Sequence, residues 1–473
     1  MSIRPSTPNR WISFIRRYIL LVGIPALILV GILHLGGHLQ APPPSSAPFA
    51  HGKELQSMPN LPLLLGQMAL IVALARIMGR LFRWFRQPQV VGEMLAGMIL
   101  GPSVLGWIMP SFSLALFPPQ SLGFLNSISL VGLVLFMFKV GLELDPGLLR
   151  GRGHAILVTS HMSIIVPFVM GALLAYGLYP LLSNNDVTFV GFALFLGSAM
   201  SVTAFPVLSR ILTEKNMLNT QVGAASLACA AVDDVTAWSI LAAIVLLVRA
   251  TSVDMPLWAT IGGSAIFVCV MLFVIRPLLR WLLERFRPVR LSNDLLAAAL
   301  VFAHLSALLT EFLGIHALFG AFLAGAVIPK DRSLIHAFTD KLEDLTVVLL
   351  LPLFFAFTGL RAKIGLLTDW QLWAICALVS VVAIAGKLGG SAVAARLTGM
   401  GWREAGALGV LMNTRGLMEL VILNVGLDIG VISPTVFTMM VLMALLTTFM
   451  TTPLLEWIYP EHLIQAERDG RRE

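Results

Sequence analysis

The sequence predicts an all-α polytopic membrane protein, on the evidence of its composition, its recurring apolar stretches and the spacing of its basic residues. Of 473 residues, 58% are hydrophobic and 12% are charged, and the mean hydropathy is +0.88. A soluble protein carries about a quarter of its residues as Asp, Glu, Lys and Arg. This chain therefore has too few charges to coat a water-facing surface, and we expect lipid to solvate most of it.

Apolar stretches long enough to cross a bilayer recur along the chain. A spanning helix needs roughly 20 apolar residues, because the hydrocarbon core is about 30 Å thick. About thirteen core spans are expected, at 61–79, 90–108, 122–143, 154–178, 188–211, 223–248, 257–276, 293–312, 316–329, 345–360, 369–396, 404–426 and 433–457.

An additional apolar stretch at 18–35 follows Arg16 and Arg17. It is either a cleaved signal peptide or a retained N-terminal helix, and its length favours the helix. The expected segments are thus an anchor or signal with a Pro-rich linker at 1–60, a transmembrane domain at 61–460 and a short cytoplasmic tail at 461–473.

Basic residues collect in alternate connections between the spans. Cytoplasmic loops of membrane proteins are enriched in Lys and Arg, so these connections and the C-terminus are predicted to be cytoplasmic. The same clustering explains the net charge of +7 without nucleic acid as a partner. The clusters are Arg80, Arg83 and Arg86; Arg150 and Arg152; Arg210 and Lys215; Arg280, Arg285, Arg287 and Arg290; Lys330, Arg332 and Lys341; Arg396 and Arg403. The three cysteines lie inside apolar stretches without CxxC spacing, which predicts neither a metal site nor a disulfide framework.

Two pairs of similar segments predict an internal repeat. Residues 136–149 match 354–367, and residues 92–97 match 320–325 at nearly the same offset. The members of each pair are separated by an odd number of expected spans, so they point in opposite directions across the bilayer. Inverted repeats are typical of secondary transporters, whose site lies where broken helices meet near the midplane. Chance similarity between apolar segments is the alternative.

Asp233 and Asp234 are the strongest chemical signal, because they are adjacent carboxylates in the middle of the span at 223–248. Placing one Asp at the centre of a membrane helix costs about 2.5–3.5 kcal/mol, and neighbouring carboxylates also repel each other. Adjacent helical residues point about 100° apart, so one aspartate can face a water-filled cavity while the other faces a neighbouring helix. The pattern indicates ion transport; a purely structural ion pair is the alternative.

Lys387 is the candidate partner of these carboxylates, because it lies deep in a long apolar stretch and a buried lysine needs a counter-charge. The alternative is that its side chain reaches the cytoplasmic interface near Arg396.

Two spans also carry helix-breaking residues. Pro206 lies in the middle of one span, and Arg415 with Gly416 in the middle of another. Broken backbone at membrane depth is tolerated only where it is buried in protein or lines a cavity, and the freed groups can then coordinate a small cation. Arg415 and Glu419 are four residues apart and can pair on one helix face. A simple proline kink is the alternative for the first span.

Together these segments resemble the cation:proton antiporter superfamily, which includes bacterial sodium/proton antiporters, potassium-efflux exchangers and plant cation/proton exchangers. The resemblance covers roughly residues 60–460, with its motifs in family order. They are residues 87–102, Gly141–Glu143, Thr203 with 205–207, Asp233 with Asp234, residues 320–325, Lys387 and Asn413–Gly416.

The resemblance implies that Thr203 and the segment of Asn413, Thr414 and Arg415 mark two crossing, unwound helices. It further implies that Asp234 binds the transported monovalent cation or a proton in turn, and that Asp233 pairs with Lys387. A homodimer in a bacterial inner membrane is implied as well.

The resemblance points two ways on ion choice. Members with two adjacent aspartates are typically electrogenic sodium/proton exchangers. Plant exchangers share the Asn-Thr-Arg-Gly segment but usually carry Asn where this chain has Asp233. Sodium is therefore favoured over potassium, with lithium as a further candidate.

The expected function is secondary active exchange of a monovalent cation for protons by alternating access, without enzymatic activity or a cofactor. A sodium- or proton-coupled symporter of an organic solute, with a related inverted-repeat fold, is the alternative. An intramembrane aspartyl protease does not fit, because its two aspartates must come from different helices.

Overall fold

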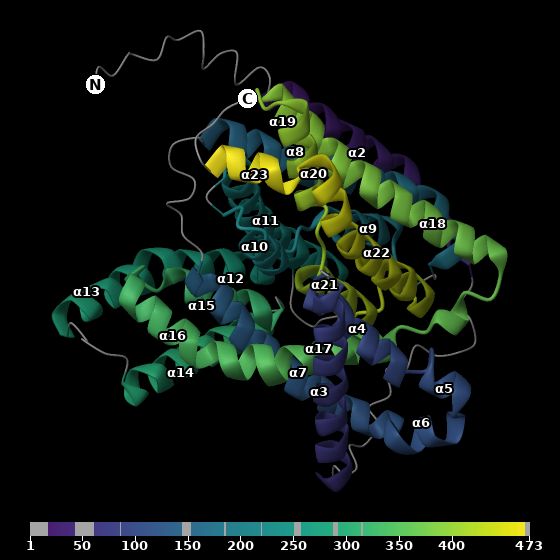
Figure 1. The fold of residues 1–473 in the computed structure, drawn as a ribbon, viewed down its shortest axis with the longest axis horizontal. Helices are drawn as coiled ribbons and strands as arrows, with labels where there is room; N and C mark the ends of the chain where they lie inside the picture. Colours follow the sequence, from purple (N-terminus) through teal and green to yellow (C-terminus); the bar gives the residue numbers. More distant parts are fainter. Residues whose placement is uncertain are drawn as a thin grey trace. The chain divides into compact units, whose positions relative to one another are not determined.

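Helices make up the described part of the chain (Figure 1). The computed structural model describes residues 18–42, 61–85, 87–143, 153–183, 186–218, 220–249, 257–286, 292–313 and 316–468. These ranges contain no strand. They contain twelve helices long and apolar enough to cross a membrane, or thirteen if one bent pair of helices counts as a span. The basic flank at Arg16 and Arg17, most of the predicted linker, and Arg86, Arg150, Arg152, Arg287 and Arg290 lie outside the described residues.

The chain folds as two units. Unit 1 comprises residues 1–46, 147–237 and 369–473, and unit 2 comprises residues 47–146 and 238–368. The helices of unit 1 are η1 (Ile19–Gly23), α2 (Ile24–Gly36), α8 (Gly153–Leu182), α9 (Phe189–Ser201), α10 (Phe205–Glu214), the first part of α11 (Gln221–Arg249), α18 (Trp370–Ile384), η6 (Ala385–Gly389), α19 (Gly390–Leu397), α20 (Trp402–Met412), α21 (Leu417–Asp428), α22 (Pro434–Ile458) and α23 (Glu461–Arg468).

Unit 2 carries the remaining helices. They are α3 (Leu61–Trp84), α4 (Gln89–Leu100), α5 (Leu105–Ile108), α6 (Pro110–Leu116), α7 (Pro119–Glu143), the last part of α11, α12 (Leu257–Val270), η3 (Met271–Ile275), α13 (Arg276–Phe286), α14 (Asn293–Phe312), α15 (Ala317–Val327), α16 (Arg332–Leu345), η4 (Thr346–Leu350), α17 (Leu351–Arg361) and η5 (Ile364–Leu366). The predicted span at 316–329 is occupied by α15, which has only eleven residues.

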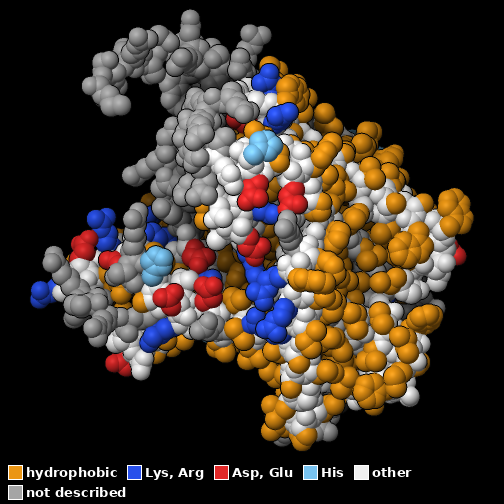
Figure 2. Space-filling model, in the orientation of Figure 1, with side chains coloured by type: hydrophobic (Ala, Val, Ile, Leu, Met, Phe, Trp, Pro, Cys, Tyr) orange, Lys and Arg blue, Asp and Glu red, His pale blue; other side chains and the backbone are white. Residues whose placement is uncertain are grey.

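Large apolar side chains cover much of the surface. Figure 2 shows broad areas of one face that are orange, the colour of hydrophobic side chains. Trp457 and Phe273, on two different long helices, are 80% and 75% exposed. Contiguous apolar surface of this extent is not stable in water, whereas a bilayer solvates it. The chain is an integral membrane protein, as its composition predicts.

Two spans of unit 1 are interrupted near their middles, where the sequence predicts them to be. Residues 202–204 separate α9 from α10, and Val202 and Ala204 there have extended backbone angles. Residues 413–416 separate α20 from α21, and these two helices are bent by 42°. Both interruptions are buried in protein, as irregular backbone at membrane depth requires.

The structure modifies one detail of the first interruption. Pro206 does not kink a continuous helix, because it is the second residue of α10. In the first turn of a helix the missing N–H has no partner to lose. The break therefore precedes the proline and leaves the backbone of residues 202–204 free to make other contacts.

In unit 2, each segment of one matching pair contacts a segment of the other pair. A Cβ atom added to Gly97 of α4 would lie 2.2 Å from the carbonyl oxygen of Ala356 in α17, and one added to Gly141 of α7 would lie 2.1 Å from that of Phe322 in α15. In each contact, one helix comes from the first pair of matching segments and the other from the second pair. Two repeats related by a pseudo-twofold axis would exchange partners in this way; the repeat and its inverted orientation stay a prediction.

Replacing Gly141 with alanine should destabilise unit 2, because the new methyl group would overlap the backbone of α15. Overpacking of this kind typically costs about 1–3 kcal/mol. Gly123 of the same helix has no atom within 4 Å of an added Cβ, and alanine at an open helical position is favoured over glycine by roughly 0.5–1 kcal/mol. Melting of the purified protein in detergent should therefore shift down for Gly141→Ala and remain or rise for Gly123→Ala. Equal shifts for the two variants would contradict the close helix contact.

Candidate functional site

Asp233 of α11 is fully buried and surrounded by hydrogen-bond donors. The hydroxyls of Ser160 and Ser163, both on α8, lie 2.7 Å from its Oδ1 and 2.8 Å from its Oδ2, respectively. The hydroxyl of Thr203, in the first interruption, lies 2.9 Å from Oδ2. A buried carboxylate is stable only when it is paired and hydrogen-bonded, and these hydroxyls supply part of that environment.

Lys387 supplies the counter-charge. Its Nζ lies 2.8 Å from Oδ2 of Asp233, and it also donates to the backbone carbonyls of Ser163 at 2.9 Å and Ser201 at 2.5 Å. Its side chain is fully buried, so the alternative position at the cytoplasmic interface is not the one it occupies. It comes from η6, a π-helical turn within the span formed by α18 and α19; such turns are frequent at functional sites.

Asp234 has a different environment, although it is the next residue of the same helix. It is only 2% exposed, and neither oxygen of its carboxylate accepts a hydrogen bond from a residue that the structure describes. The backbone N–H of Phe205, the first residue of α10, lies close enough to interact with it. The positive end of a helix dipole thus faces Asp234, while Asp233 carries the direct ion pair.

The two interrupted spans touch at their breaks. The backbone N–H of Ala204 donates to the carbonyl of Thr414 at 3.0 Å, and the hydroxyl of Thr203 lies 3.0 Å from the carbonyl of Met412. The side-chain oxygens of Asn413 and Thr414 are buried and have no hydrogen-bond partner among the described residues. The second break therefore carries two unpaired side-chain oxygens, and it lies against the first break, residues 202–204, which immediately precedes Phe205.

Arg415 and Glu419 form a second buried ion pair, with 3.4 Å between Nη1 and Oε2. Arg415 also donates to the carbonyls of Ala199 at 2.8 Å and Met200 at 2.6 Å, in the last turn of α9. A cation is favourable at the negative end of a helix dipole. Arg415 therefore fixes the second break against the end of the first broken helix.

Sequence reasoning missed several polar residues that hold this arrangement. Ser160 and Ser163 contact Asp233 from α8, and Thr448 of α22 bonds the backbone N–H and carbonyl of Arg415 at 3.2 and 2.8 Å. The two serines are three residues apart, which places them on one helix face. This spacing is the sequence feature that could have identified them as site residues. Serine and threonine are common in membrane helices, so that signal does not by itself distinguish a site from packing.

The chain is similar to known cation:proton antiporters over most of its length. Residues 69–457 match the family model "Sodium/hydrogen exchanger, transmembrane". The sequence is 45% identical to the Na(+)/H(+) antiporter NhaS4 of Synechocystis over 403 residues, which covers 85% of this chain and 98% of that protein.

Two further comparisons are informative. The sequence is 36% identical to the K(+)/H(+) antiporter 1 of Saccharomyces cerevisiae over 87% of this chain, which corresponds to 48% of the yeast protein. The chain thus spans about half the length of that relative. The fold matches the sodium proton antiporter MjNhaP1 of Methanocaldococcus jannaschii with a TM-score of 0.63 and 16% identity, covering 86% of this chain and 98% of that structure.

The matched region contains both broken spans and the two fully buried ion pairs described above, and transport proteins rather than enzymes make up the matched family. The predicted membership of the cation:proton antiporter superfamily is thereby confirmed. The chain belongs to the sodium/hydrogen exchanger family and is a monovalent cation:proton antiporter.

Proposed function

We propose that Asp234 is the residue that binds the transported cation and a proton in turn. The observation that carries this proposal is that its carboxylate is buried without a hydrogen-bond partner in the described structure, beside interrupted backbone. A buried carboxylate without a direct counter-charge is costly unless a proton or a cation neutralises it. Binding of either species excludes the other, and that competition couples the two fluxes.

The neighbouring groups supply further ligands. Sodium, potassium and lithium are hard cations that prefer carboxylate, carbonyl and hydroxyl oxygens. Asn413 and Thr414 hold unpaired side-chain oxygens at the second break. We propose that the cation site combines Asp234 with oxygens of the two breaks, and that alternating access exposes it to each side of the membrane.

Asp233 and Lys387 form the fixed part of the site in this proposal. Their ion pair, together with the hydroxyl of Thr203, holds the first break against α11. Arg415 and Glu419 hold the second break against α9. Because this frame is rigid, it fixes the positions of Asp234 and of the oxygens at the two breaks. The spacing of these ligands then lets the site distinguish one cation from another.

Sodium is the proposed cation, and the two adjacent aspartates are the reason. NhaS4 is named as a Na(+)/H(+) antiporter, whereas the yeast relative is named as a K(+)/H(+) antiporter, so the family contains both preferences. Both relatives are antiporters, which disfavours the organic-solute symporter. A homodimer in a bacterial inner membrane, with a cytoplasmic C-terminus, completes the proposal.

Purified protein in sealed vesicles should exchange protons for sodium and lithium faster than for potassium. Proton flux is followed with a pH-sensitive dye after each cation is added outside, and membrane current is recorded under the same conditions. A current is expected, because the resemblance to members with two adjacent aspartates implies electrogenic exchange, which moves net charge. Potassium-driven flux that exceeds sodium-driven flux would overturn the choice of ion, and counterflow of an organic solute would support the symporter instead.

A further inference from the structure

Lys387 is held by three acceptors, and two of them are backbone carbonyls. Its Nζ lies 2.8 Å from Oδ2 of Asp233, 2.9 Å from the carbonyl oxygen of Ser163 and 2.5 Å from that of Ser201. An ammonium group has three N–H donors, so this set satisfies all of them. Inside a helix each carbonyl accepts from the N–H four residues later. A carbonyl that lacks this N–H therefore offers an acceptor that is otherwise unsatisfied.

The sequence accounts for both of these carbonyls. Ser201 is the last residue of α9, so its carbonyl lies at the first break. Ser163 lies inside α8, but the residue four positions later is Pro167, which has no N–H. The carbonyl of Ser163 therefore lacks its regular helical partner, and Lys387 takes that place. Prolines are tolerated in membrane helices where neighbouring groups satisfy the freed carbonyl in this way.

Gly386 lets the turn that carries Lys387 approach this proline. Gly386 and Pro167 are both buried, and a Cβ atom added to Gly386 would lie 2.9 Å from Cα and 3.2 Å from Cβ of Pro167. Gly389, in the same π-helical turn η6, has no atom within 4 Å of an added Cβ. The close contact thus belongs to the glycine that directly precedes Lys387.

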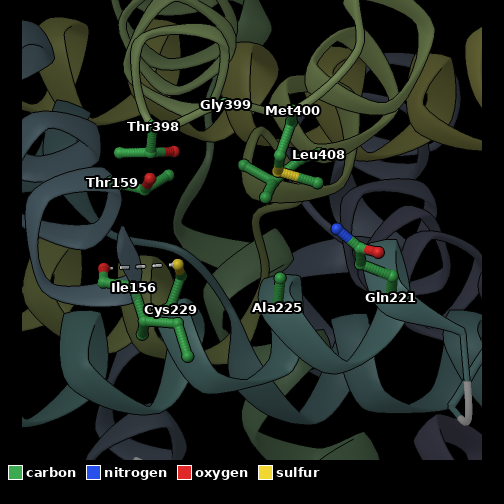
Figure 3. A pocket seen from close by; sticks show the side chains of 9 residues that line it. All are labelled: Ile156, Thr159, Gln221, Ala225, Cys229, Thr398, Gly399, Met400 and Leu408. Atoms are coloured by element: carbon green, nitrogen blue, oxygen red, sulfur yellow. Dashed lines mark hydrogen bonds between the residues drawn. The ribbon is translucent and has the colours of Figure 1, made fainter. Parts of the chain in front are cut away.

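The packing of α8 is not close along its whole length. Nearer its N-terminus, residues of α8, α11, α20 and the turn after α19, among them Ile156 and Cys229, line a cavity of about 180 Å³ (Figure 3). The Cys229 thiol donates there to the carbonyl of Ile156 at 3.7 Å, which is the dashed line in Figure 3. Ser160, four residues after Ile156, has an N–H, so this carbonyl has a helical donor and the thiol adds only a long bond. The short bond from a side chain is made where the proline removes that donor.

We propose that Pro167 is a positioning residue for exchange: by freeing the Ser163 carbonyl, it supplies the third acceptor that holds Lys387 against Asp233. The proposal rests on the role proposed above for this ion pair as the fixed part of the cation site. Without the free carbonyl, one N–H of a buried ammonium group loses its partner. A hydrogen bond to a charged group shifts an equilibrium by about 10- to 100-fold. Its loss therefore lowers the fraction of molecules in which Lys387 lies against Asp233.

Pro167→Ala should slow exchange, because the new N–H at position 167 takes the Ser163 carbonyl. We expect sodium-driven proton flux in vesicles to fall by about tenfold or more. Pro180→Ala is the matched control and should keep the original rate, since Pro180 also lies inside α8 but is exposed near its C-terminal end. The sodium-dependent rise in melting temperature of the purified protein, which reports cation binding at Asp234, should persist in both variants. Equal flux in the two variants, or loss of that rise in Pro167→Ala alone, would overturn the proposal.

A backbone ester separates the missing N–H from the ring of the proline. The α-hydroxy acid analogue of alanine, introduced at position 167 by nonsense suppression, has the side chain of alanine but an ester oxygen in place of the N–H. Flux should return to near the rate of the unaltered chain, and the same ester at position 180 controls for the ester itself. An ester variant as slow as Pro167→Ala would show that the ring matters and the free carbonyl does not, which would overturn the proposal.

Melting temperature provides a test that does not depend on transport. Replacing a proline inside a helix with alanine normally favours the helix, but at Pro167 the gain is offset while Lys387 needs the carbonyl. In a chain that also carries Asp233→Asn and Lys387→Met, no ammonium group needs it, so Pro167→Ala should raise the melting temperature more there than in the unaltered chain. An equal change in the two chains would show no coupling between Pro167 and the ion pair and would overturn the proposal. Absence of flux in the unaltered chain would overturn the proposed cation site, whereas this comparison would still decide the role of Pro167.

Gly386→Ala covers the case in which Pro167→Ala does not fold. Its methyl group would overlap Pro167 and displace η6, so flux should fall as in Pro167→Ala. Gly389→Ala, in the same turn, should keep the original rate because its methyl group meets no neighbouring atom. Equal rates for these two variants would contradict the close approach of η6 to α8 on which the proposal depends.

Discussion

Asp234→Asn should abolish cation-coupled proton flux while leaving the protein folded. Asparagine has nearly the same shape, but it can neither carry a proton at this position nor neutralise a cation. Since a positioned proton-transfer group contributes typically 10²- to 10⁴-fold to a rate, a fall of about 10²-fold or more is expected. The measurement is the initial rate of sodium-driven proton flux in vesicles that contain equal amounts of each protein.

The matched control is Asp428→Asn, which removes an exposed carboxylate from α21 in the same unit. It should exchange at the original rate. Asp234→Asn should also lose the sodium-dependent rise in melting temperature, yet it should melt no lower than the unaltered chain without sodium, because removal of an unpaired buried charge relieves its cost. Normal exchange by Asp234→Asn would assign the carrier role to another residue.

Lys387→Met should destabilise unit 1 strongly. It removes the cation but leaves the carboxylate of Asp233 buried, and breaking a buried pair in this way typically costs about 3–5 kcal/mol. It also frees the carbonyls of Ser163 and Ser201 that Lys387 now bonds. Thermal melting in detergent, together with the yield of folded protein after purification, measures the effect.

The double variant Asp233→Asn with Lys387→Met is the decisive comparison. It removes both charges, so much of the lost stability should return, although exchange should not. Lys215→Met provides the control for loss of a lysine: Lys215 pairs with Glu456, and both side chains are partly exposed. An exposed pair contributes about 0–1 kcal/mol, so a small shift is expected. If Lys387→Met melted like Lys215→Met, the buried pair would not support the fold.

Local sequence was sufficient for the fold class and for placing the two aspartates within a helix long and apolar enough to cross a membrane. Hydropathy, span length and charge are properties of residues that are close together in the chain, and a bilayer acts on each segment in the same way wherever its neighbours lie. The interruption at Asn413–Gly416 could be recognised for the same reason, because Arg415 and Gly416 in the middle of a span do not fit a continuous membrane helix. The similarity of residues 136–149 to 354–367 likewise needed no structure.

The residue pattern by itself did not show which of the two aspartates is paired; the family resemblance implied Asp233, and the physical reason lies in the tertiary structure. Asp233 and Asp234 are identical in type and adjacent in sequence, and the rotation of α11 against α8 gives one of them Ser160, Ser163 and Lys387. Contacts between segments far apart in the chain depend on how helices pack, and neither hydropathy nor periodicity contains that information. The cavity beside Cys229 has the same origin, since it is the space left where side chains from α8, α11, α20 and the turn after α19 do not meet.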